Sequence, residues 1–81
     1  MEIPRIQNVN VTGEHTLIVG FSNGKRKLYD ISSLLEKEMF APLKLPAFLK
    51  NVQIEQGGYA LIWNKDIDIS EYELWKNGVD F

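Results

Sequence analysis

Cysteine is absent from this sequence of 81 residues, and there is a single histidine. Without cysteine the chain has no disulfide, no thiolate metal ligand and no thiol nucleophile, which excludes redox and zinc-ribbon functions and fits a reducing compartment. A Ser-His-Asp triad is the nucleophilic arrangement that remains, but His15 lies beside an expected turn and no serine sits in a G-x-S-x-G elbow. We therefore expect a protein that is not an enzyme and has no catalytic residues.

Long apolar segments are also missing. The longest apolar run, Leu17 to Phe21, is far too short to span a membrane. The N-terminus lacks the basic segment and the apolar stretch that together mark a secretory signal. We expect a cytoplasmic protein with no membrane partner.

Neither charge is in strong excess, because 9 Lys and Arg residues face 11 Asp and Glu residues and the net charge is −2. Nucleic-acid binding needs a concentrated basic face, so we do not expect direct binding of nucleic acid. The one basic run, Lys25-Arg26-Lys27, points to alternate sides in a strand and makes no single patch. Residues 55–81 hold 2 basic and 6 acidic side chains, which makes this part of the chain acidic.

No repeat, low-complexity tract or linker divides the chain, so residues 1–81 are predicted to form one domain. A chain of this length buries only about 60% of the surface that its unfolded form exposes. Nearly every large apolar side chain is then needed for the core, and little remains to line a deep cavity.

A first strand and a hairpin are predicted in the N-terminal half. Residues 6–12 alternate apolar and polar side chains, as in a half-buried strand. Residues 16–22 and 25–30 flank Asn23-Gly24, the pair best suited to a two-residue type I′ loop with Gly24 at positive φ. The resulting register pairs Val19 with Leu28 and Ile18 with Tyr29.

A second hairpin is predicted around Gly57-Gly58, between residues 52–56 and 59–64. At least one of the two glycines is expected at positive φ. The pairing places one strongly apolar set of side chains on the same face: Val52, Ile54, Tyr59, Leu61 and Trp63.

Short helices are predicted from capping signals. Ser33 and Glu36 form an S-x-x-E capping box that favours one or two helical turns. Residues 40–45 are expected to be irregular because prolines interrupt them. Pro46 is well placed as the first residue of a short helix that continues to Lys50.

The last helix carries the best-marked start. Ser70 is the expected N-cap, Glu73 completes a capping box, and Asn77-Gly78 is expected to supply a left-handed C-cap. These elements predict an α+β fold: a single small domain with one antiparallel sheet of about five strands, formed by two hairpins and an N-terminal strand, and two or three short helices.

Carboxylates precede this helix. Asp66-x-Asp68-x-Ser70 resembles the opening of a calcium loop, but glycine is missing at the sixth position and Asn77 stands where the bidentate carboxylate belongs. Acidic side chains also stabilise a helix N-terminus without any metal. We expect no metal site and no cofactor.

Aromatic residues gather in the C-terminal third. Adjacent helical residues point about 100° apart, so Leu74 and Trp75 cannot both lie at the centre of a narrow buried stripe. Either the C-terminal segment folds back over the sheet, or its exposed aromatic side chains meet a second copy or another protein. The candidate interaction surface consists of Tyr72, Trp75 and Phe81.

Several short motifs follow one another along the chain: Pro4-Arg5-Ile6, Phe21-Ser22-Asn23-Gly24, Tyr29-Asp30-Ile31, Phe40-Ala41-Pro42-Leu43, Gly57-Gly58-Tyr59, Trp63-Asn64 and Asp68-Ile69-Ser70. Taken in this order, they resemble the bacterial family known as domain of unknown function 2442. The resemblance covers essentially the whole chain. One departure is Leu45, which stands before Pro46 where an aspartate cap is expected.

The resemblance implies a small α+β domain with no recognised catalytic residues. Some similar proteins continue into a helix-turn-helix domain, and because this sequence ends at Phe81 we expect no DNA binding by that route. Others have been described, from gene order, as the antitoxin half of a toxin–antitoxin pair. The leading hypothesis is a non-enzymatic protein-interaction module that binds a small partner protein encoded nearby, as an antitoxin binds its toxin, and that also forms a homodimer or a heteromeric contact. The alternative is a small-molecule or regulatory ligand-binding domain, with a groove between the sheet and residues 40–50.

Overall fold

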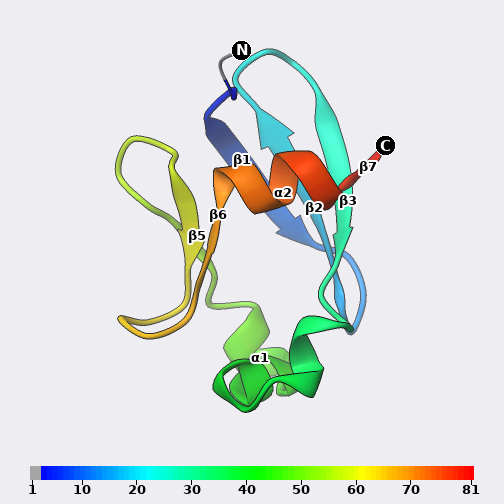
Figure 1. Ribbon diagram of the computed structural model, residues 1–81, viewed down its shortest axis with the longest axis vertical. Helices are drawn as coiled ribbons and strands as arrows, with labels where there is room; N and C mark the ends of the chain where they lie inside the picture. The colour runs from blue at the N-terminus through cyan, green and yellow to red at the C-terminus, as the bar shows by residue number, and fades with distance from the viewer. Residues whose placement is uncertain (1–2) are drawn as a thin grey trace.

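The computed structural model describes residues 3–81 and combines antiparallel sheets with short helices (Figure 1). The α+β class predicted from the sequence is therefore confirmed. The elements follow in the order β1 (Ile6–Val11), β2 (Thr16–Phe21), β3 (Arg26–Asp30), η1 (Leu34–Glu36), η2 (Glu38–Lys44), α1 (Pro46–Leu49), β4 (Gln53–Ile54), β5 (Ala60–Ile62), β6 (Asp68–Ser70), α2 (Glu71–Asn77) and β7 (Val79–Asp80), where η marks a 3-10 helix.

The strands form two sheets where the sequence predicted one. All five predicted strands are present, but β1, β2 and β3 belong to a four-stranded sheet of order β1-β2-β3-β7, and β4 and β5 to a three-stranded sheet of order β4-β5-β6. The strands β6 and β7 are additional. Each has only two or three residues, too few for an alternating pattern to be recognised in the sequence.

The first hairpin has a different register from the predicted one. Leu17 pairs with Tyr29 and Ile18 with Leu28, one residue away from the predicted pairing. A one-residue shift moves every side chain of a strand to the other face of the sheet. The observed register buries Tyr29 and leaves Asp30 exposed, whereas the predicted register would have turned the Asp30 carboxylate toward the core.

The shift lengthens the loop from two residues to three. Gly24 N–H donates to the Phe21 carbonyl at 3.0 Å, and Phe21 N–H donates to the Lys25 carbonyl at 2.9 Å. Gly24 has a φ of 87°, as predicted, but no residue other than glycine has a positive φ in the described chain, so Asn23 does not form a type I′ turn. The loop is a turn followed by a left-handed glycine.

The second hairpin confirms its predicted register, because Ile54 pairs with Leu61 and Gln53 with Ile62. Gly57 and Gly58 both have positive φ, at 100° and 79°. Gly58 also brings the turn against the first sheet: its carbonyl accepts from Ile6 N–H at 2.9 Å, and a Cβ there would lie 2.6 Å from the Ile6 carbonyl oxygen. This glycine therefore joins the two sheets.

The segment between the sheets is helical over most of its length. Ser33 precedes η1 but its side chain makes no capping hydrogen bond, so the predicted capping box is not formed. Residues 40–45, expected to be irregular, belong largely to η2, which tolerates Pro42. Pro46 begins α1 as predicted.

Helix α2 starts as predicted and ends differently. The Ser70 side chain accepts a hydrogen bond from Glu73 N–H at 3.1 Å. Gly78, however, has φ −71° and ψ 154°, so the predicted left-handed C-cap is wrong. The extended backbone at Gly78 leads directly into β7, and a Cβ there would lie 3.0 Å from the Lys27 Cβ of β3.

A single apolar core lies between the two sheets and the helical segment. It is formed by Ile6, Leu17, Val19, Phe21, Tyr29, Ile31, Phe40, Leu43, Leu49, Leu61, Trp63, Ile67, Ile69 and Leu74. Trp63 connects the second sheet to the helical segment, because its indole N–H donates to the Leu49 carbonyl at 2.9 Å. The fold therefore holds its parts together through one shared core rather than through one continuous sheet.

Candidate interaction surface

Helix α2 is fixed on the first sheet before its aromatic side chains reach solvent. Leu74 is fully buried, and the Tyr29 hydroxyl of β3 donates to Glu73 Oε2 at 2.8 Å. Burial, together with the hydrogen bond to the Glu73 carboxylate, raises the pKa of Tyr29. Glu73 therefore binds the sheet instead of completing the capping box of its own helix.

Trp75 is half-buried and packs against the sheet. Its ring meets the Phe21 ring edge to face, with centroids 5.1 Å apart and planes at 78°. Lys27 of β3 places Nζ 4.6 Å from the centre of the Trp75 ring and 3.4 Å from Asp80 Oδ1. Trp75 therefore anchors α2 to the sheet and presents only part of its ring to solvent.

Phe81 follows β7 at the edge of the same sheet. Its N–H donates to the Arg26 carbonyl at 3.1 Å, so its backbone continues the pairing of β7 with β3. The side chain is 63% exposed, and the Arg26 guanidinium carbon lies 5.3 Å from its ring centre. The C-terminal segment thus folds back onto the sheet while its last side chain stays in solvent.

Tyr72 lies on the exposed side of α2, three residues before Trp75. Residues at this spacing are neighbours on a helix surface. Tyr72 is 53% exposed, and Lys76 Nζ lies 5.5 Å from its ring centre. The structure therefore places Tyr72 and Trp75 on one side of α2. Phe81 lies beyond the end of that helix, and strand alternation directs its side chain, with that of Arg26, to the face of the sheet opposite Lys27 and Trp75.

Sequence analysis did not predict the basic side chains of this surface. Arg26, Lys27 and Lys76 each lie over one of the three aromatic rings, although the C-terminal third itself is acidic. Two of these cations come from β3: Arg26 reaches Phe81 because β7 pairs with β3, and Lys27 reaches Trp75 because α2 packs on β3. The one signal in the sequence is the alternation of Val79, Asp80 and Phe81, which is too short to identify a strand.

A second polar cluster surrounds Arg5 at the start of β1. Its guanidinium donates to the Tyr59 hydroxyl at 3.2 Å, to Glu71 Oε2 at 3.3 Å and to the Ile3 carbonyl at 3.1 Å. The hydrogen bond with Tyr59 and the nearby Glu71 carboxylate raise the pKa of Arg5. This cluster ties β1 to the second hairpin and to α2.

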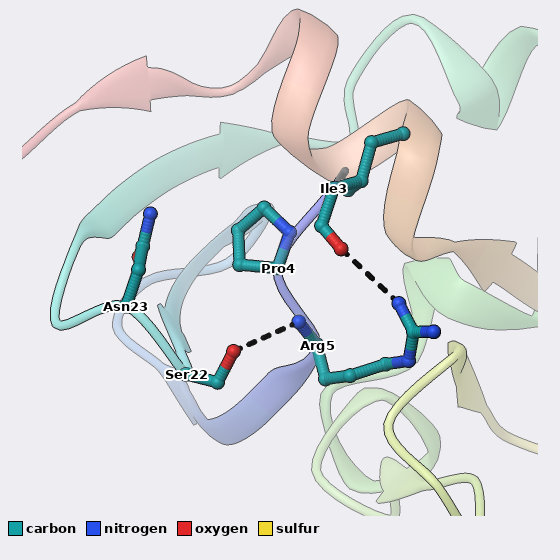
Figure 2. Close-up of a pocket in the computed structure, with 5 residues that line it drawn as sticks. All are labelled: Ile3, Pro4, Arg5, Ser22 and Asn23. Carbon is teal, nitrogen blue, oxygen red and sulfur yellow. Dashed lines mark hydrogen bonds between the residues drawn. The ribbon is translucent and has the colours of Figure 1, made fainter. Parts of the chain in front are cut away.

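Beside this cluster lies an open pocket of about 440 Å³ (Figure 2). Figure 2 shows that the polar atoms of its wall bond to one another: Arg5 N–H donates to Ser22 Oγ at 3.1 Å, and the Arg5 guanidinium turns toward the Ile3 carbonyl. Asn23 Oδ1 accepts from Lys25 N–H at 3.0 Å. The wall therefore stabilises the first hairpin loop and offers no set of convergent free groups.

A further hollow of about 360 Å³ lies between the turn after β1 and helix α1. It is lined by Val11, Thr12, Gly13, Glu14, Pro46 and Lys50. It occupies the position predicted for a ligand groove, between the sheet and residues 40–50.

His15 and the acidic side chains of residues 3–81 do not gather into a metal site. Within this range no cluster of three or more His, Asp or Glu side chains could hold a metal ion. The backbone carbonyl of His15 accepts from Ile31 N–H at 2.8 Å, which joins the turn before β2 to the end of β3. No helix in the described part of the chain is long and apolar enough to cross a membrane.

The match to a protein-family model covers residues 6–80, from the first strand to the C-terminal segment. This model is described as "Protein of unknown function (DUF2442)". The chain belongs to this family. Among curated proteins and solved structures, none matches the chain significantly. The DUF2442 assignment agrees with the order of motifs along the sequence.

Proposed function

We propose that this DUF2442 protein is a non-enzymatic, cytoplasmic interaction module that binds a small partner protein encoded nearby, as an antitoxin binds its toxin. The observation that carries the proposal is the exposure of aromatic side chains on ordered backbone. Phe81 and Tyr72 are 63% and 53% exposed, although each extends from a paired strand or a helix. Exposed aromatic residues on rigid elements are the usual anchors of protein interfaces.

The arrangement lowers the entropic cost of binding. The Ser70 cap and the bond between Tyr29 and Glu73 hold α2 in place, and pairing with β3 holds Phe81. Because the backbone is already held in place, binding loses little backbone conformational entropy. Large exposed apolar side chains also occur elsewhere, but Tyr72 lies one helical turn from the half-buried Trp75, whose packing on Phe21 fixes this part of α2 on the sheet.

Charge defines the partner more closely. The acidic groups beside the aromatic rings are already bonded, because Asp80 pairs with Lys27 and Glu73 accepts from Tyr29. Arg26 and Lys76 keep their positive charges over exposed rings. A partner that presents acidic side chains around an apolar patch fits this surface, since complementary charges steer and orient association.

The proposal is tested by co-expression with the product of the adjacent gene. We expect a growth defect caused by the neighbour alone, relief of that defect by this protein, and recovery of the two proteins as a complex. Absence of a complex with the wild-type protein would contradict the proposal.

Substitutions locate the interface. Tyr72→Ala with Phe81→Ala should weaken the complex by at least about tenfold, because anchor residues dominate binding energy. Leu45→Ala is the matched control, since Leu45 is 63% exposed but precedes α1, outside the proposed interface. Equal affinity of the double variant and the control would show that the partner binds elsewhere.

A second candidate function is ligand binding in the hollow between β1 and α1. The favouring observation is that Lys50 and Glu14 border the same hollow of about 360 Å³, which combines charge with apolar walls. A chemical-shift titration with small charged metabolites tests this function. Shifts confined to the lining residues and lost in Lys50→Ala would support it, and shifts spread over the whole surface would not.

A further inference from the structure

The outer edge of β1 lacks the usual protection of an exposed strand. No charged residue or proline occurs between Ile6 and Thr12, and β1 has six residues. The other edge strand of the same sheet, β7, has two residues and carries Asp80. Proteins commonly keep sheet edges from pairing by shortening them or charging them. A bulge at the start of β1 gives some protection, but residues 8–12 have none of these features.

The backbone of this edge offers unused hydrogen-bonding groups. Thr12 N–H donates to the Thr16 carbonyl at 3.1 Å, and alternation in an antiparallel ladder then directs the backbone groups of Asn10 toward β2 as well. Val9 and Val11 therefore direct their N–H and C=O groups away from β2. Within residues 3–81 these groups have no partner, whereas Ile6 N–H, which also points outward, donates to Gly58.

The side chains at the edge are also incompletely covered. Val9 and Val11 lie on the core face, opposite Val19 and Leu17 of β2. The two β2 residues are 0% exposed, whereas Val9 and Val11 remain partly exposed at the edge of the sheet. A further strand at this edge would bury apolar surface as well as satisfy the backbone groups.

We propose that β1 pairs antiparallel with β1 of a second copy of this chain, about a twofold axis that passes through Asn10. In this register Val9 of each copy exchanges both backbone hydrogen bonds with Val11 of the other. Asn10 lies directly opposite Asn10 of the second copy, on the solvent face. The two four-stranded sheets become one continuous sheet.

A second copy fits this edge because the edge is self-complementary. A twofold interface must present the same residues from both sides, and the sequence Val9-Asn10-Val11 is the same when read in either direction. Both hydrogen-bonded positions then pair valine with valine, and no like charges oppose each other near the axis. The pairing brings the Ile6 end of the second β1 to the Thr12 end of the first, which borders the hollow of about 360 Å³.

The proposed dimer does not depend on the proposed function. The sheet order places β1 and β7 at opposite edges (Figure 1), so the surface formed by Tyr72, Trp75 and Phe81 stays free on both copies. A dimer through β1 therefore still presents this surface to a partner protein. A variant that no longer forms the β1 dimer should still bind the partner protein, and a variant that no longer binds the partner should still form the dimer.

Charge substitutions at Asn10 test the register. Its side chain is exposed, so Asn10→Lys and Asn10→Asp should both fold. In the twofold register each variant opposes its own charge in a non-hydrogen-bonded pair, where Cα atoms are only about 4.5 Å apart. We expect sedimentation equilibrium to show a dimer for the wild-type protein, and a dissociation constant raised by roughly tenfold in each variant alone.

Mixing provides the decisive measurement. Equal amounts of Asn10→Lys and Asn10→Asp should form a heterodimer at least as stable as the wild-type dimer, since opposite charges then face each other. Ser33→Lys is the control for added charge, because Ser33 is exposed, follows β3 rather than β1, and makes no capping bond. A monomeric wild-type protein at millimolar concentration would overturn the proposal, as would charge variants that dimerise as well alone as when mixed.

Discussion

Individual residues in this protein hold the backbone in conformations that others could not. Gly24 is the clearest example, since its φ of 87° lies in the left-handed region. A Cβ at this position would meet no atom within 4 Å, so only backbone conformation restricts the residue type. A substitution at Gly24 therefore adds backbone strain without adding a steric clash.

Gly24→Val should therefore destabilise the protein by about 1 kcal/mol or more, because a β-branched residue is strained at positive φ. Gly24→Asn should lose less, since asparagine tolerates this region. The measurement is the free energy of unfolding from urea denaturation of both variants and the wild type. Equal stability of the valine and asparagine variants would contradict the assigned turn.

Tyr29 couples the fold to alkaline pH. The ordinary pKa of tyrosine is 10.0, and burial with the bond to Glu73 raises the pKa of Tyr29 in the folded protein. The folded state then holds this proton more tightly than the unfolded chain does. The contribution of Tyr29 is fully present below the ordinary pKa and is lost as the pH rises above it.

We expect the urea midpoint of the wild-type protein to fall between about pH 9 and pH 11, as unfolded tyrosine ionises. Tyr29→Phe should be less stable near neutral pH but should show a smaller alkaline decrease. Tyr72→Phe is the control, because Tyr72 is exposed, and its alkaline decrease should match that of the wild type. An identical decrease in all three proteins would exclude the coupling.

Two helices of the chain begin with the same sequence pattern but differ in structure. Ser33 and Ser70 both stand three residues before a glutamate. The Ser70 side chain caps α2, whereas Ser33 has helical φ and ψ and leaves η1 uncapped. An N-cap requires extended backbone, and the chain enters η1 from a tight turn in which Asp30 Oδ1 accepts from Ser32 N–H at 2.8 Å.

This difference predicts unequal effects of the same substitution. Ser70→Ala should cost about 1 kcal/mol of stability, because the first turn of α2 loses its capping acceptor. Ser33→Ala should change stability by less than about 0.5 kcal/mol, as expected for a surface position without a specific bond. Thermal or urea unfolding of the two variants provides the comparison, and equal losses would show that the cap of α2 contributes nothing.

Across the whole molecule, local patterns predicted most elements but not their partners. The positions of the two hairpin turns, the start of α2 and the start of α1 follow from side chains within a few residues, so the sequence was sufficient for them. The register of the first hairpin depends on which face of β3 meets the core, a choice made by distant residues. The pair Asn23-Gly24 therefore predicted a two-residue loop, whereas the structure has a three-residue loop.

The candidate surface shows the same limit. The exposure of Tyr72 and Phe81 agrees with the pattern of α2 and the short chain length, but the partial burial of Trp75 requires Phe21 of β2. The cation over Phe81 requires the pairing of β7 with β3, and the cation over Trp75 requires α2 to pack on β3. Contacts between residues far apart in the sequence were not accessible to reasoning over short windows.

The two sheets should unfold together because one core joins them. Trp63 lies at the second sheet and bonds to the Leu49 carbonyl of α1, and Trp75 packs on Phe21 of the first sheet. Trp63→Phe and Trp75→Phe each leave one fluorescent reporter, in a different half of the molecule. In both variants the fluorescence midpoint in urea should coincide with the midpoint from far-ultraviolet circular dichroism, as in two-state unfolding. A fluorescence transition that precedes the circular dichroism transition in either variant would show that its half unfolds independently, and the shared core would then fail to couple the two sheets.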